Sequence, residues 1–187
     1  VLGAGSYGTA LAFCFARNGH RVIMWGRDAD QIADMASSRE NAKYLPGAKF
    51  PDTLEVTADL EFAVKQADVH LVVVPSHVFA DLLVQIQPWL PAEPKVCWAT
   101  KGLDPESGRL LQDVARDILG DKPSLAVLSG PTFAKEMVAG LPTAISLSST
   151  DDAFVHDLSE LLHKNCCPLH LKLVLGTENI CVETCDK

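Results

Sequence analysis

The sequence predicts an α/β fold in which a doubly wound, mostly parallel sheet carries helices on both faces. Two observations support this prediction. Short apolar runs alternate with longer segments of helical periodicity along most of the 187 residues. A glycine-rich hexamer of the form G-x-G-x-x-G, Gly3 to Gly8, lies between the first apolar run and the first helical segment. Together they indicate strands joined by crossover helices.

Apolar and β-branched runs mark the expected strands, in order, at residues 1–2, 21–25, 54–56, 69–74, 96–100, 125–128 and 143–147. The run at 69–74 is apolar at nearly every position, which is typical of a strand buried on both faces. Prolines and a glycine make residues 41–52 a loop. Beyond the alternation of strands and helices the sequence contains no internal repeat, and no segment is of low complexity.

Segments with helical spacing predict helices, in order, at residues 6–18, 28–38, 60–66, 77–90, 107–119, 132–138 and 151–162. Asp59 and Asp151 stand where two of these helices begin, which suits the positive end of a helix. Gly19, Gly120 and Gly140 stand where three of them end.

Composition and charge exclude several classes of protein. Sixteen basic and twenty-four acidic residues give a net charge of −8, which repels phosphate backbones, so we expect no nucleic-acid partner. The longest apolar stretch, residues 69–75, is interrupted by His70 and is too short to span a membrane. With no secretory leader and few cysteines, a cytoplasmic location is expected.

Both ends of the chain are unusual. It begins at Val1, without Met, and reaches the glycine hexamer within two residues, so we interpret it as a fragment whose first strand is clipped. Four of the six cysteines, Cys166, Cys167, Cys181 and Cys185, crowd the last residues. Their spacing does not fit a structural zinc site, so we expect no metal and an apolar or unstructured tail.

The glycine hexamer predicts a Rossmann-type dinucleotide site. Gly3 would allow a tight turn, Gly5 a close approach of backbone to a pyrophosphate, and Gly8 close packing of helix on sheet. Ser6 and Tyr7 are the first residues able to donate to phosphate oxygens at the helix N-terminus. The alternative is a glycine-rich turn without a ligand, which the flanking strand and helix make less favoured.

The residues after the second strand favour NADP(H), with NAD(H) also accepted. An NAD-specific unit carries a carboxylate near the position of Gly26, where this chain has none. Arg27 instead supplies a guanidinium suited to a 2′-phosphate. The alternative is that Arg27 pairs with Asp28 or Asp30 on the surface.

Several motifs together give the chain a family resemblance. GAGSYGTA at residues 3–10, KYLPG at 43–47, VPSHVF at 74–79, ATKGL at 99–103, SGPTFAKE at 129–136 and LPTA at 141–144 occur in order. In this the chain resembles the NAD(P)-dependent glycerol-3-phosphate dehydrogenases, over roughly residues 1–162. The resemblance implies interconversion of sn-glycerol 3-phosphate and dihydroxyacetone phosphate for glycerophospholipid synthesis. It also implies a Rossmann-type N-terminal domain followed by a helical substrate domain, a small phosphorylated substrate, and a homodimer of the full-length parent.

Residue by residue, the resemblance implies two groups of contacts. The cofactor contacts would be the three glycines, Ser6, Tyr7, Arg27, Tyr44 on the adenine side, Lys101 and Ala134. The substrate contacts would be Lys101, Gly130 and Thr132.

Elementary chemistry supports the ligand-binding roles that the resemblance implies for Lys101 and for residues 129–132. Lys101 follows an apolar strand, at the edge of a parallel sheet where ligands bind, and could neutralise a phosphate. The alternative is a surface lysine that pairs with Asp104. Residues 129–132 form a second start of a helix after a strand, although Ser and Thr are also ordinary helix caps. His77, at the start of another helix, is more simply a cap or surface group than a base.

The resemblance stops near His163. The family's proton-transfer lysine has no counterpart here, since Lys172 and Lys187 have the wrong neighbours, so the catalytic residue is unknown. We therefore expect a cofactor domain at 1–163, a divergent tail at 164–187 of frameshifted or alternatively spliced origin, and no helical substrate domain. Such a chain should bind nucleotide with little or no turnover. The alternatives are a non-catalytic nucleotide-binding module and a dehydrogenase of another hydroxy acid.

Overall fold

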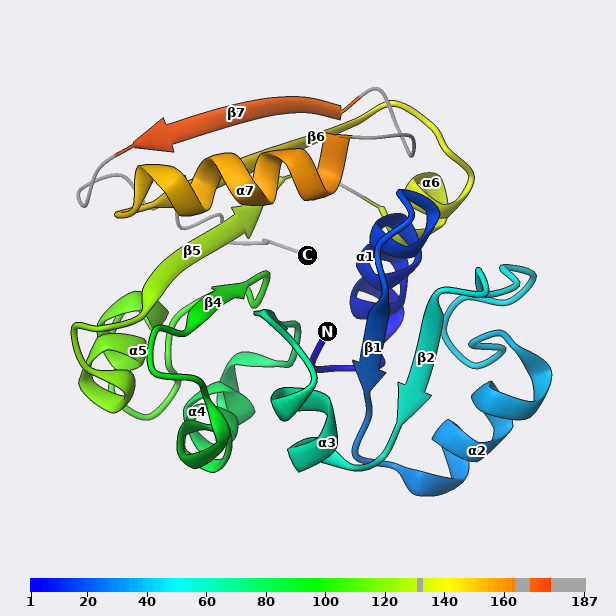
Figure 1. The fold of residues 1–187 in the computed structure, drawn as a ribbon, viewed down its shortest axis with the longest axis horizontal. Helices are drawn as coiled ribbons and strands as arrows, with labels where there is room; N and C mark the ends of the chain where they lie inside the picture. Colours follow the sequence, from blue (N-terminus) through cyan, green and yellow to red (C-terminus); the bar gives the residue numbers. More distant parts are fainter. Residues whose placement is uncertain (131–132, 164–168, 176–187) are drawn as a thin grey trace.

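A computed structural model describes residues 1–130, 133–163 and 169–175 of the chain (Figure 1). The strands are β1 (Val22–Trp25), β2 (Leu54–Thr57), β3 (Val69–Val72), β4 (Lys95–Trp98), β5 (Ser124–Ser129), β6 (Thr143–Ser149) and β7 (Leu169–Leu175). The α-helices are α1 (Ser6–Arg17), α2 (Ala29–Ser38), α3 (Leu60–Lys65), α4 (Phe79–Ile86), α5 (Leu111–Leu119), α6 (Ala134–Val138) and α7 (Asp152–His163). The predicted alternation of strands and helices is confirmed.

The residues ahead of α1 join the strands into one arrangement. Leu2 forms parallel bridges with both Trp25 of β1 and Val72 of β3, so it lies between the pair β2-β1 and the series β3-β4-β5-β6-β7. Neighbouring strands from β2 to β5 are parallel, β6 runs antiparallel to β5, and β7 is parallel to β6. The mostly parallel Rossmann-type fold is therefore confirmed.

The order of the strands reverses beside Leu2. From this position the chain builds outward to β1 and β2 on one side, and then to β3, β4 and β5 on the other. Ligands of open α/β sheets bind at such a switch point, beyond the carboxyl ends of the strands. The glycine hexamer begins at this point.

Two hydrophobic clusters cover the two faces of the sheet. On one face α1, α6 and α7 contribute Leu11, Met137 and Phe154. On the other face α3, α4 and α5 contribute Val64, Phe79 and Leu111 (Figure 1). The doubly wound arrangement follows, because each helix buries its apolar stripe against the sheet.

Two predicted helices differ from the structure. The helix expected at 107–119 begins only at Leu111, because the carboxylate of Asp104 accepts hydrogen bonds from both the N–H and the hydroxyl of Ser107. Gly108 then adopts a left-handed φ of 68°. The helix expected at 77–90 is α4 flanked by short 3-10 turns at Ser76–Val78 and Gln87–Trp89.

The C-terminal part differs as well. The helix expected at 132–138 begins at Ala134, and Thr132 lies outside the described residues. Strand β7 was not predicted, because the tail was expected to be apolar or unstructured. It lengthens the sheet by pairing along the whole of β6.

The described helices include none that is long and apolar enough to cross a membrane. Cys14 and Cys97 are buried, whereas Cys166, Cys167, Cys181 and Cys185 lie outside the described ranges. Within those ranges, no group of three or more His, Cys, Asp or Glu residues could hold a metal ion.

Candidate nucleotide-binding site

The three glycines of the hexamer meet three different environments. Gly3 has a φ of 127°, and a Cβ there would lie 2.1 Å from the carbonyl oxygen of Val73. A Cβ on Gly8 would lie 2.0 Å from the carbonyl oxygen of Gly3, so α1 packs directly on the turn. A Cβ on Gly5 would meet nothing within 4 Å. This is the pattern of a turn, a close packing contact and an open approach to the backbone.

The N-terminus of α1 has the features of an anion site. Gly5 is its N-cap residue, no side chain caps it, and its first turn contains no acidic residue. The helix has 12 residues, so its dipole places positive charge at Ser6 and Tyr7. These features fit a pyrophosphate, which would take the place of the missing cap.

Arg27 stands in the turn between β1 and α2, at the same edge of the sheet. It is exposed, and it takes part in no ion pair with any described residue. The carboxylate of Asp28 instead accepts the N–H of Gln31 at 3.0 Å and caps α2. The proposed pairing of Arg27 with Asp28 or Asp30 is therefore not formed, and the guanidinium faces solvent.

Gly26 explains the missing carboxylate in steric terms. It is buried, and a Cβ there would lie 2.9 Å from both Ala4 Cβ and Ile32 Cδ1. The turn after β1 is thus packed against the glycine hexamer. A side chain at position 26 would have to displace both of these neighbours.

The loop that carries Tyr44 is held beside the glycine hexamer by Asn41, a residue that the sequence analysis did not select. Asn41 is fully buried, and its side-chain amide donates to the carbonyl oxygen of Ala4 at 3.0 Å. Tyr44 is 42% exposed, with the ammonium of Lys43 5.1 Å from its ring centroid. The signal available in the sequence was an Asn three residues before Tyr44, the spacing of a side-chain cap.

Lys101 lies beyond the carboxyl end of β4, a strand that β3 separates from Leu2. Its strand still pairs with β3 at Ala99, whose N–H donates to the carbonyl oxygen of Val72 at 3.0 Å. Lys101 is exposed and forms no ion pair with Asp104. The hydrogen bonds from Ser107 occupy the carboxylate of Asp104 and lower its pKa. The alternative role of Lys101 as a partner of Asp104 is therefore not supported.

The segment expected to contact substrate is described only in part. Gly130 follows β5, and a Cβ there would lie 2.3 Å from the carbonyl oxygen of Ala144, so packing against β6 by itself requires glycine. Ala134 is the first residue of α6, and no side chain caps this helix. Pro131 and Thr132 lie outside the described residues, so the expected contact of Thr132 is not placed.

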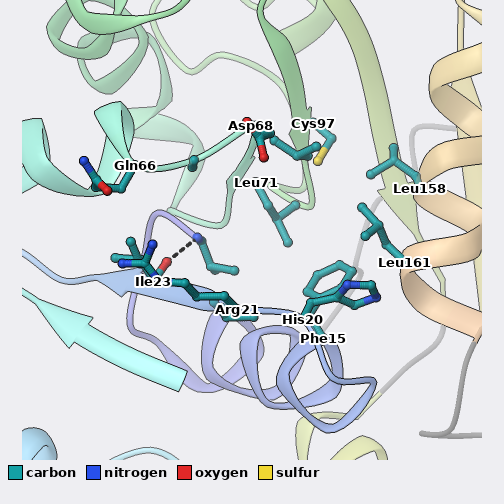
Figure 2. A pocket seen from close by; sticks show the side chains of 14 residues that line it. Phe15, His20, Arg21, Ile23, Gln66, Asp68, Leu71, Cys97, Leu158 and Leu161 are labelled. Atoms are coloured by element: carbon teal, nitrogen blue, oxygen red, sulfur yellow. Dashed lines mark hydrogen bonds between the residues drawn. The ribbon is translucent and has the colours of Figure 1, made fainter. Parts of the chain in front are cut away.

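A cavity of about 400 Å³ lies at the opposite edge of the sheet, where β1 and β3 begin (Figure 2). Its lining is largely apolar, with Phe15, Leu71 and Leu158 among its residues. The backbone nitrogen of Val1 donates to the carbonyl oxygen of Ile23 at 2.7 Å at this edge. No residue of the predicted site lines this cavity. The cavity is therefore separate from the edge that carries the glycine hexamer.

Comparison with known proteins gives a consistent result. Residues 1–155 match a family model described as the N-terminus of NAD-dependent glycerol-3-phosphate dehydrogenase. A glycerol-3-phosphate dehydrogenase [NAD(P)+] of Colwellia psychrerythraea is 66% identical over 163 residues, which are 87% of this chain and 49% of that protein. The corresponding protein of Aeromonas hydrophila is 59% identical with the same coverage.

A solved structure agrees with these relatives. The crystal structure of glycerol-3-phosphate dehydrogenase from Coxiella burnetii matches with a TM-score of 0.87 and 39% identity, over 92% of this chain and 52% of that one. The chain thus spans about half the length of the curated relatives it matches.

Proposed function

Because this chain belongs to the NAD-dependent glycerol-3-phosphate dehydrogenase family, we propose that it is the cofactor-binding half of an enzyme that interconverts sn-glycerol 3-phosphate and dihydroxyacetone phosphate. The cofactor would be NADP(H), with NAD(H) also accepted. The observation that carries the proposal is the glycine hexamer, whose open Gly5 lies between two glycines that packing requires. This cradle fits a pyrophosphate at the N-terminus of α1.

Each residue of this half has a distinct role in the proposal. The backbone of Gly5, Ser6 and Tyr7 would receive the pyrophosphate, and Arg27 would hold the 2′-phosphate of NADP(H). When bound, the nicotinamide ring exchanges a hydride with the substrate carbon. Lys101 would neutralise the substrate's charge beside it.

The remaining site residues are part of the same proposal. Tyr44 would line the adenine side, Ala134 would contact cofactor, and Gly130 with Thr132 would contact the phosphorylated substrate. We assign the cofactor domain to residues 1–163 and the divergent tail to residues 164–187. A helical substrate domain and the group that moves the proton would come from the other half of a full-length protein. A cytoplasmic location and a homodimer of that protein stay predictions.

The test is a fluorescence titration of the 187-residue chain with NADPH and NADH. We expect saturable binding, with NADPH the tighter ligand. Arg27→Ala should raise the Kd of NADPH by about ten- to a hundredfold, because a charge-assisted hydrogen bond is lost. The Kd of NADH should stay unchanged. Arg21→Ala is the matched control. Arg21 immediately precedes β1, away from the site, and forms an ion pair with Glu55 of the neighbouring strand.

The same preparation tests turnover. We expect no reduction of NADP⁺ when glycerol 3-phosphate is added to this chain alone. Joining residues 1–163 to the C-terminal half of a relative should restore activity. An equal loss of affinity for NADPH and NADH in Arg27→Ala would contradict the role of Arg27. Binding without turnover in the joined protein would instead favour a non-catalytic nucleotide-binding module.

A further inference from the structure

We propose that Asn41 is a positioning residue that locks the glycine hexamer and the Tyr44 loop into one unit, so that it sets nucleotide affinity without touching the nucleotide. This inference rests on the proposed function, because it takes both segments to be parts of one cofactor site. It adds to that proposal a residue that neither the sequence motifs nor the comparisons single out.

The side chain of Asn41 uses both ends of its amide. Its Nδ2 donates to the carbonyl oxygen of Ala4 at 3.0 Å and to the hydroxyl oxygen of Thr9 at 2.8 Å. Its Oδ1 accepts the N–H of Tyr44 at 3.2 Å. Asn41 and Thr9 are each 0% exposed, so water cannot replace these bonds. One side chain thus connects the hexamer, helix α1 and the Tyr44 loop.

The carbonyl group of Ala4 is the point where the cofactor segments meet. Its oxygen also accepts a hydrogen bond at 3.3 Å from Nε2 of Gln31, a residue of the helix that follows Arg27. Ala4 stands between Gly3 and Gly5, so a rotation of its peptide bond would move the N–H of Gly5. The pyrophosphate approach and the Tyr44 loop therefore share one set of hydrogen bonds.

The Tyr44 loop has a second anchor that does not depend on the side chain of Asn41. Leu45 is 2% exposed, and its N–H donates to the backbone oxygen of Asn41 at 2.8 Å. We therefore expect the loop to stay folded when the side chain of Asn41 is changed. What should be lost is the fixed relation between the loop and Ala4.

Asn41→Asp separates this role from general stability. At about pH 8 an aspartate can accept from Tyr44 and Thr9 but cannot donate to Ala4, and the two oxygens repel. We expect the Kd of NADP⁺, which is stable in acid, to rise about tenfold, as for one lost buried hydrogen bond. Burial at this fully enclosed position raises the pKa of a carboxyl group, so at about pH 5.5 we expect the protonated form to donate again and most of the affinity to return. Asn41→Ala should bind NADP⁺ weakly at both pH values.

The matched control is Thr9→Val, which removes only the contact with the helix. It should lower stability but keep the Kd of NADP⁺ within about twofold, because the bonds to Ala4 and Tyr44 remain. Charged side chains surround Asn41, with Glu40 and Lys43 on its own loop and Asp28, Asp30 and Asp34 at helix α2 lining the same hollow, so each variant is compared with wild type at the same pH.

A measurement without nucleotide keeps the two proposals apart. In Asn41→Ala, hydrogen exchange should speed up in residues 3–9 and 41–45 together. Faster exchange in 41–45 alone would overturn the coupling. So would wild-type affinity of folded Asn41→Asp and Asn41→Ala at both pH values. Wild-type chain that binds no nucleotide would reject the proposed function, while the exchange experiment would still decide the coupling.

Discussion

At the scale of single residues, neighbouring glycines of the hexamer serve different physical purposes. Gly8 is required by packing, since a Cβ there would lie 2.0 Å from a backbone oxygen. Gly5 has an ordinary φ of −78° and open space around it, so the folded chain alone does not require glycine there. A requirement for glycine at this position would therefore come from the proposed ligand, so stability can be separated from binding by mutation.

Gly5→Ala and Gly8→Ala test this separation. Gly8→Ala should lower the free energy of unfolding by about 1–3 kcal/mol, as overpacking does, and weaken binding with it. Gly5→Ala should leave the free energy of unfolding within about 1 kcal/mol of wild type. It should still weaken the binding of NADPH about tenfold, because its methyl group enters the space of the pyrophosphate. Urea unfolding and nucleotide titration measure both effects. Full affinity in Gly5→Ala would show that no phosphate approaches there.

At the scale of elements, α1 supports two parts of the proposed site. Its N-terminus follows the glycine hexamer, and its side holds α6, which carries Ala134. A helix of five residues is not stable alone, so α6 depends on this contact. The Arg17 guanidinium donates to the carbonyl oxygen of Val138 at 2.9 Å, and Met137 is buried to 1% exposure in the core.

Met137→Ala should therefore damage the molecule through α6. We expect the free energy of unfolding to fall by about 2–5 kcal/mol, the usual cost of a large cavity in a core. Glu136→Ala, at an exposed position of the same helix, should change it by less than about 0.5 kcal/mol. Urea denaturation of the two variants is the measurement. Similar values for both would mean that α6 adds nothing to the folded core.

At the scale of the whole molecule, the sheet buries an ionisable group between its strands and α3. His70 is 1% exposed, and its Nε2 lies 2.9 Å from the carbonyl oxygen of Val64. Burial is the main cause that lowers the pKa of His70 from 6.5. The native state therefore binds fewer protons than the unfolded state below that pH. The stability that His70 contributes is complete above pH 6.5 and falls as the pH drops toward the lowered native pKa.

We predict a slope in stability of at most about 1.4 kcal/mol per pH unit from this residue, below its unfolded pKa. His70→Gln should flatten the curve between about pH 5 and about pH 6.5, because glutamine does not titrate. Asp104 and Asp151 have lowered pKa values too, and they act only at more acidic pH. Urea unfolding across this range is the measurement, and parallel curves for variant and wild type would contradict the prediction.

The sequence by itself determined the features that depend on nearby residues. The rhythm of strands and helices, the cap of α3 at Asp59 and the three environments of the glycine hexamer were all predictable. The rhythm and the Asp59 cap depend on chemistry within a few positions of the chain, whereas the roles of the glycines follow from the motif, since Gly3 meets the distant Val73 in the folded chain. The fold class and the family motifs follow from this local order.

Only the tertiary structure decided which distant groups meet. Asn41 lies 37 positions from Ala4, and the residues next to Asn41 in the sequence do not indicate that partner. The alternative pairing of Asp104 with Lys101 is not formed, because the Asp104 carboxylate accepts hydrogen bonds from Ser107, which also delay the start of α5. Strand β7 exists in the sheet because β6 offers it an edge. Buried hydrogen bonds and strand pairing are chosen by competition among partners far apart in sequence, and a local pattern does not record the outcome of that competition.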